Sequence, residues 1–190
     1  QSRFDKQKTK DGSYSHLVLL CENNEGYKNL IKLVSKGFTE GFYSKPRVDR
    51  ELLEKYSNGL IALSACLAGE IPRLILNGEY DKAKETAIWY RDTFGEGNYY
   101  LELQDHNIRE QKIVNPQILK ISKETGIPVV ATNDVHYTLK EDNKMHKVLL
   151  CIQTGSKIGD ENALEFKTDE FYLKSEEEML ELFPKEALEN

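Results

Sequence analysis

The chain has 190 residues, of which 39% are hydrophobic, 31% are charged and 9% are aromatic. This length is enough for one domain with its own core, and the composition excludes collagen-like, linker-like and wholly disordered chains. No apolar run reaches the roughly 18 residues that a membrane span needs. Three scattered cysteines are too few for a disulfide framework, so we expect a reducing, cytoplasmic setting without a membrane partner.

The net charge of −6 is unevenly distributed. Residues 157–190 hold 11 acids and 4 bases, a net of −7, which leaves +1 for residues 1–156. A near-neutral body argues against a protein that binds duplex DNA mainly through its own positive surface. A small site that handles phosphates through metal ions remains compatible with it. For the acidic tail, a solvated helix face is the simplest interpretation.

Apolar runs alternate with amphipathic segments along the first half of the chain. Asn23 and Asn24 offer a helix cap, because their side chains can accept hydrogen bonds from the first turn of a helix. In chain order, the spacing predicts a strand over 16–20, a helix over 27–38, a loop over 41–46, a short helix over 48–56 and a buried strand over 59–64.

The second half continues the same alternation. Asn115-Pro116 indicates the start of a helix or a kink in it, and Gly126 indicates its end. The elements predicted here are a helix over 80–90, a strand over 99–103, a helix around 114–121, a strand over 128–132, a helix over 145–152 and a weak helical pattern over 179–183. Strands that alternate with helices predict an α/β fold with a parallel sheet, whose chemistry lies at the carboxyl ends of the strands.

Asp134 and His136 directly follow the strand predicted over 128–132. In an extended segment, residues at i and i+2 point to the same side. A carboxylate and an imidazole that converge on one point suit a divalent metal ion, although such a pair alone is a weak signal. The position after a strand strengthens the interpretation.

The other cysteines and histidines allow two interpretations. Cys66 follows a strand, so it is a buried hydrophobe or a thiolate ligand, and spacing alone favours the former. His16 opens its strand, which favours a structural role. His106 follows a strand, and a loop histidine or a site residue is equally compatible. His146 is predicted to be a surface or helix-packing residue, and Cys21 and Cys151 are predicted to lie in the core.

The sequence contains no P-loop, no G-x-G-x-x-G, no G-x-S-x-G and no C-x-x-C. P-loop NTPases, Rossmann dehydrogenases, α/β-hydrolases and zinc ribbons therefore have no support from motifs. What remains is a site of Asp, His and Cys on an α/β fold. Metal-assisted hydrolysis of a phosphoester suits such a site, because the ions offset the charge on the phosphoryl oxygens.

The run Pro128-Val-Val-Ala-Thr-Asn-Asp-Val-His-Tyr137 resembles the last motif of the PHP (polymerase and histidinol phosphatase) domain. More narrowly, it is similar to the version in the alpha subunits of bacterial replicative DNA polymerase III. Stretches that also agree with that family, in order, are 15–20 with 24–30, 45–49, 63–72, 100–106, 148–155 and 171–175. The resemblance covers nearly the whole chain.

The resemblance implies part of a distorted (βα)7 barrel with up to three metal ions, Zn, Mn or Fe. By motif, the implied metal ligands are His16, Cys66, Asp134 and His136, of which Asp134 and His136 would be catalytic. Arg47 and His106 are implied contacts to phosphate or substrate. Residues 1–156 would form the later portion of the PHP domain, and residues 157–190 an acidic segment leading towards the polymerase palm.

The chain departs from the family pattern in one respect, since it has no H-x-H motif, and His16 is its first histidine. We therefore expect a piece of a PHP domain that lacks the first strands and about half of the ligands. An incomplete metal cluster and little or no activity of the 190 residues alone follow from that expectation. Unpaired sheet edges also predict self-association.

The function implied is that of a part of a DNA-directed DNA polymerase (nucleotidyltransferase) in DNA replication. Its intact PHP domain would act as a metal-dependent 3′–5′ exonuclease. The implied partners are the rest of the alpha subunit, DNA and other replicase subunits. Two alternatives stay open: a stand-alone PHP phosphoesterase, and a catalytically silent structural or interaction module of the polymerase.

Overall fold

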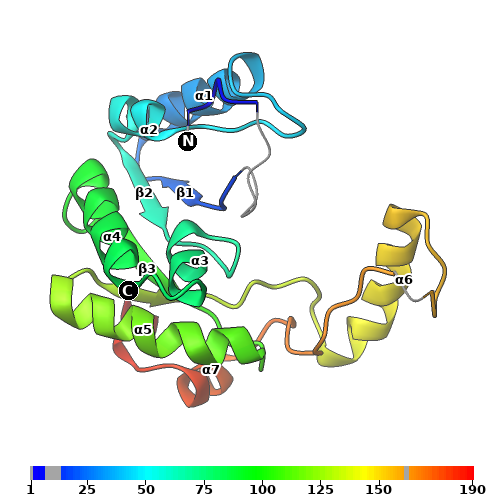
Figure 1. Ribbon diagram of the computed structural model, residues 1–190. Helices are drawn as coiled ribbons and strands as arrows, with labels where there is room; N and C mark the ends of the chain where they lie inside the picture. Colours follow the sequence, from blue (N-terminus) through cyan, green and yellow to red (C-terminus); the bar gives the residue numbers. More distant parts are fainter. Residues whose placement is uncertain (1, 7–13, 161–162) are drawn as a thin grey trace.

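The computed structural model describes residues 2–6, 14–160 and 163–190 (Figure 1). The strands are β1 (Val18–Cys21), β2 (Leu60–Leu63), β3 (Tyr99–Leu103) and β4 (Val129–Ala131). The helices are α1 (Asn24–Thr39), α2 (Arg50–Tyr56), α3 (Glu70–Leu76), α4 (Tyr80–Phe94), α5 (Arg109–Thr125), α6 (Asn143–Thr154), α7 (Glu176–Leu182) and α8 (Glu186–Glu189), with a 3-10 turn η1 (Lys140–Asp142). The α/β class predicted from the sequence is confirmed.

The four strands form one sheet in the order β1-β2-β3-β4, in which β2, β3 and β4 are parallel. Strand β1 runs antiparallel to β2, so the prediction of an all-parallel sheet is wrong for this strand. Two helices, α1 and α2, connect β1 to β2, and the pair returns the chain to the end at which β1 finished (Figure 1). Strand β2 therefore starts beside the last residue of β1, with Leu60 opposite Cys21.

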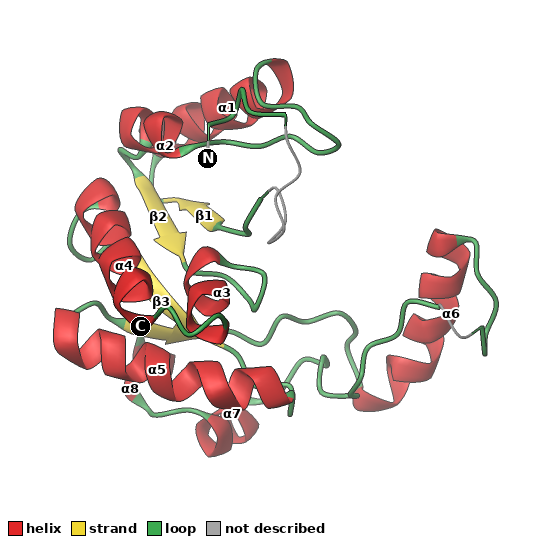
Figure 2. Cartoon of the chain, viewed as in Figure 1, coloured by secondary structure: helices red, strands yellow, loops and turns green. Residues whose placement is uncertain are grey.

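The core lies between the sheet and the helices that cover it (Figure 2). Successive side chains of a strand point to opposite faces, and Tyr99, Leu101 and Leu103 of β3 all lie on one face. Each of the three is at most 1% exposed, and they belong to the same core as Ile118 and Ile121 of α5. Burying each large apolar side chain contributes roughly 1.5–3 kcal/mol, so this layer fixes the position of β3.

Three local features were missed, left open or wrongly predicted from the sequence. Helix α3 was not predicted, although Pro72 is compatible with its first turn, whose N–H groups have no partner within the helix. Helix α5 begins at Arg109, so of the two positions predicted for Pro116, at the start of the helix or inside it, the structure shows the second. Cys151 is buried as predicted, but Cys21 is exposed because β1 is the last strand of the sheet on its side.

The last third of the chain leaves the body and returns to it. Helix α6 lies on an arm that projects from the body (Figure 1). The tail comes back to the body, where Phe183 and Ala187 join the core and α8 packs against β4. No helix in the described part of the chain is long and apolar enough to cross a membrane. The described residues form an open four-stranded sheet rather than a closed barrel.

Candidate metal and phosphoester site

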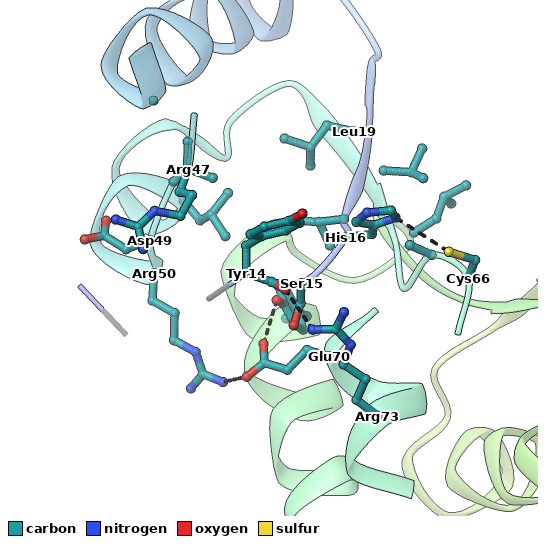
Figure 3. Close-up of a pocket in the computed structure, with 18 of the residues that line it drawn as sticks. Tyr14, Ser15, His16, Leu19, Arg47, Asp49, Arg50, Cys66, Glu70 and Arg73 are labelled. Carbon is teal, nitrogen blue, oxygen red and sulfur yellow. Dashed lines mark hydrogen bonds and ion pairs between the residues drawn. The ribbon is translucent and has the colours of Figure 1, made fainter. Parts of the chain in front are cut away.

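A cavity of about 1120 Å³ opens between α1, α2, α3 and the sheet (Figure 3). Its apolar wall comes from β1 and α1 and includes Leu19 and Leu33. At the end where β2, β3 and β4 finish, it is lined by His16, Cys66 and Asp134. Three of the four residues predicted as metal ligands therefore share one cavity.

The antiparallel course of β1 explains why His16 belongs to this site. His16 precedes β1, and β1 starts where β2 ends, with Val18 opposite Leu63. His16 Nδ1 lies 3.6 Å from Cys66 Sγ, and Figure 3 shows the two side chains facing each other. The start of an antiparallel strand and the end of its neighbour lie at the same edge of the sheet. The sequence-based preference for a structural His16 assumed a parallel strand.

The turn after β2 is tightly constrained around Cys66. Ala65 has a φ of +64°, in the left-handed region that costs energy for a residue other than glycine. The N–H of Gly69 donates to the carbonyl of Cys66 at 2.7 Å. A Cβ on Gly69 would lie 2.2 Å from the carbonyl oxygen of Ser64, so only glycine fits there. The backbone thus holds the thiol towards His16.

The charge state of Cys66 depends on what binds beside it. Burial raises the pKa of the Cys66 thiol, and the nearby negative charges of Asp134 and Glu102 raise it further. The thiol is therefore protonated near neutral pH in the absence of a cation. A metal ion beside it would reverse this, because a coordinated thiol loses its proton.

Asp134 and His136 form a second pair. His136 Nε2 lies 3.6 Å from Asp134 Oδ1, so the two side chains converge as predicted. Asp134 has a φ of +41°, in the left-handed region, so the segment is not extended at this residue and the turn brings the two side chains together. His136 is not among the residues that line the cavity, and its ring instead packs against aromatic side chains.

Both pairs have the spacing of two ligands on one metal ion. With bonds of about 2.0 Å to histidine nitrogen and about 2.3 Å to cysteine sulfur, tetrahedral ligands lie about 3.5 Å apart. The N···S and N···O separations of 3.6 Å agree with this value. Among the described residues, no three His, Cys, Asp or Glu side chains are grouped so that they could hold an ion. Donor types and pair spacing therefore fit metal ions, and each pair would need further ligands.

The two predicted phosphate or substrate contacts are engaged within the protein. Arg47 lines the cavity but is only 7% exposed, and its guanidinium donates to the carbonyls of Gly41, Arg3 and Asp5. His106 is 1% exposed, with Nδ1 at 2.9 Å from Gln111 Nε2 and Nε2 at 3.0 Å from the carbonyl of Asn133.

Burial lowers the pKa of His106, so the ring is neutral at pH 7. The hydrogen bonds of Arg47 and His106 favour structural roles for both residues. Contact with substrate stays a prediction.

Sequence reasoning missed the buried carboxylate of Glu102, which also lines the cavity. Glu102 is 5% exposed and accepts hydrogen bonds from the backbone of Ala65 and the side chains of Gln104 and Thr132. It thereby joins the ends of β2, β3 and β4. One signal was present in the sequence, since Glu102 is the only charged residue in the otherwise apolar strand Tyr99–Leu103.

The PHP domain family matches residues 2–106, which is more than half of the chain. The chain belongs to the PHP domain family. This confirms the family resemblance of its motifs, and it places His16, Cys66 and the strands β1 to β3 inside the matched part of the PHP domain.

Three curated relatives sharpen the comparison, and each is named DNA polymerase III subunit alpha. The relative from Borreliella burgdorferi is 50% identical over all of this chain and 17% of its own length. Those from Treponema pallidum and Deinococcus radiodurans are 50% and 46% identical, over 97% and 96% of this chain and 16% and 14% of their own lengths. This PHP chain therefore spans about a sixth of the length of the relatives it matches.

Proposed function

We propose that this chain is the PHP-domain part of a DNA polymerase III alpha subunit, a nucleotidyltransferase that extends DNA during replication. The observation that carries the proposal is the 50% identity along the whole chain to proteins of that name. In this proposal, further strands outside the 190 residues complete the distorted (βα)7 barrel beyond β1. Residues 157–190 are the connection towards the rest of the subunit.

The proposed activity of the intact domain is hydrolysis of a terminal phosphodiester in DNA, a 3′–5′ exonuclease. Two features of the chain support it. The donor types of His16, Cys66, Asp134 and His136 suit Zn, Mn or Fe. The cavity that His16, Cys66 and Asp134 line has a volume of about 1120 Å³, which is large enough for a nucleotide.

In this mechanism, the residues of the chain would hold the metal ions and orient the ligands that bind them. His16 and Cys66 would supply one pair of ligands, and Asp134 and His136 the other. Divalent ions held there would supply Lewis-acid chemistry and offset the negative charge of the phosphoryl group. Glu102 keeps the ends of three strands together, which fixes the distance between the two pairs. The thiol of Cys66 would lose its proton when a metal ion binds between His16 and Cys66.

One alternative has a specific observation in its favour. Because no three potential ligands are grouped among the described residues, the domain could serve as a silent structural or interaction module of the polymerase. A stand-alone PHP phosphoesterase has less support, since the matched relatives are named as polymerase subunits and align with the whole chain, including the segment after Tyr137. DNA and other replicase subunits are the partners proposed for the parent protein.

The test uses the full-length natural protein with and without Asp134→Asn. Asparagine tolerates the left-handed backbone of Asp134, so the turn is retained. The substitution removes only the negative charge of the side chain. We expect bound Zn, Mn or Fe in the wild type by elemental analysis, together with 3′–5′ hydrolysis of single-stranded DNA. The variant should lose hydrolysis by more than about 100-fold, since even partners that only orient a ligand contribute 10–100-fold.

Asp105→Asn is the matched control, because Asp105 follows β3 but does not line the cavity. It should leave metal content and hydrolysis unchanged. A wild-type protein without bound metal and without hydrolysis would support the silent module and reject the exonuclease.

A further inference from the structure

The loop that carries Asp134 and His136 is held by a segment from the far side of the arm. The backbone N–H of His136 donates to the carbonyl of Phe171 at 2.9 Å, and the N–H of Leu173 donates to the carbonyl of Thr138 at 3.3 Å. Tyr137 and Tyr172 form a parallel bridge between the two segments. Residues 171–173 therefore lie beside 136–138 like an added strand.

Phe171 belongs to a stack of rings that flanks the side chain of His136. The Phe171 side chain is 6% exposed, stacks on His106 at 4.0 Å between centroids and stacks on Phe166 at 4.5 Å. The imidazole of His136 meets both phenylalanines edge-on, with centroid distances of 4.6 Å to Phe166 and 5.5 Å to Phe171. His146 of α6 extends the stack, with its ring 4.9 Å from that of Phe166 and 5.6 Å from that of His136.

These contacts restrict the direction in which His136 points. Its side chain is 37% exposed, and an imidazole at such a position would ordinarily sample several rotamers. The stacked rings flank the imidazole along one side, and in that position its Nε2 faces Asp134 at 3.6 Å. Edge-to-face contacts between aromatic rings favour this arrangement beyond simple burial.

We propose that Phe171, with Phe166, is a positioning residue that fixes the imidazole of His136 towards Asp134. In consequence, residues 163–173 belong to the site and are more than a connection between domains. This inference rests on the proposed function, in which His136 is a metal ligand. Ligands whose orientation is fixed by a surrounding shell bind metal more tightly, because less freedom is lost on binding.

Phe171→Leu in the full-length natural protein tests the proposal, with Phe183→Leu as the matched control. Both phenylalanines lie in the tail and are nearly equally buried, at 6% and 7%, but Phe183 belongs to the core beside β4. Phe166→Leu is the second variant, since Phe166 is only partly buried and its loss disturbs folding less. Tm is measured for each variant.

Two readouts separate the outcomes. Metal affinity, titrated on metal-free protein, should fall about 10-fold in Phe171→Leu and Phe166→Leu and stay unchanged in Phe183→Leu, by analogy with other partners that orient ligating histidines. The rate at which diethyl pyrocarbonate modifies His136 in metal-free protein, followed by peptide mass spectrometry, should rise several-fold in the first two variants only.

Equal modification rates in all variants and wild type would overturn the positioning role. If the wild type bound no metal, the proposed function would fail, while the modification rates would still decide whether Phe171 and Phe166 fix His136. A rise in Phe183→Leu equal to that in Phe171→Leu would also reject the proposal, because loss of stability would then explain both.

Discussion

The two outer strands of the sheet differ in whether the described part of the chain covers them. Beside β4, Asn190 Nδ2 donates to the carbonyl of Val129 at 2.9 Å, and Phe183 and Ala187 are buried there. Along β1, by contrast, Val18 and Leu20 are 36% and 49% exposed. One side of the sheet is closed by the chain's own tail, and the other presents apolar side chains at an open edge. Closure into a barrel removes such edges, so the proposed continuation of the barrel belongs at β1.

The two sides also differ in the forces that stabilise them. Near β4 the tail is held by apolar burial, and α1 and α2 are likewise anchored in the core by Leu33, Leu52 and Leu53, whereas residues 2–6 are held beside these helices by charges and hydrogen bonds. The side chain of Arg3 forms ion pairs with Glu40, Asp49 and Glu51, which tie residues 2–6 to α1 and α2. This contrast predicts different responses of the two sides to mutation and to pH.

The largest expected effect is on the β4 side. Phe183→Ala should lower the free energy of unfolding by about 3–5 kcal/mol, because it removes a 7% exposed ring from the core. Phe38→Ala, on α1, removes a ring that is 57% exposed and lies outside the core, so it should cost less than about 0.5 kcal/mol. Urea denaturation measures both, and equal losses would refute the contrast.

An intermediate effect is expected from acid on the β1 side. Burial by itself raises the pKa of Asp49, but hydrogen bonds from the backbone of Arg3 and Leu52 and from the Arg3 guanidinium outweigh it and lower the pKa. A carboxyl whose pKa is lower in the folded state stabilises the fold above its unfolded pKa of about 3.9 and loses that contribution as the pH falls through the folded value.

Hydrogen exchange in α1 and α2 should therefore accelerate as the pH falls below about 4, after correction for intrinsic rates, while α8 changes less. Asp49→Asn should flatten this dependence. A pH response of the same size in the variant would mean that another group is responsible.

The smallest effect is expected at the helix caps of the two sides. Asn23 accepts hydrogen bonds from the backbone of Glu25 and Gly26 at the start of α1, and Ser175 forms a capping box with Glu178 at the start of α7. Asn23→Ala and Ser175→Ala should each cost about 1 kcal/mol, while Asn23→Asp retains the cap. Thermal denaturation measures how much stability each substitution removes. Hydrogen exchange shows whether the destabilisation is confined to the helix whose cap is removed.

Much of the candidate site was predictable because it depends on short-range order. Asp134 and His136 follow a strand at a spacing of two, which pointed to the pair, although a left-handed turn at Asp134 and not an extended segment brings the two side chains together. Cys66 and His16 needed the family resemblance, because a cysteine after a strand is most often a packing residue. Phe171 could not be found this way, since its contacts to His136 join segments far apart in the sequence.

The sequence by itself determined the order and type of the main elements, the apolar core of β3 and the family. These follow from periodicity, turn residues and motifs, which are local properties of the chain. Only the tertiary structure decided that β1 runs antiparallel, because strand direction depends on how α1 and α2 pack before the chain reaches β2. That one decision brings His16 to within 3.6 Å of Cys66 and makes the start of one strand and the ends of three others a single site.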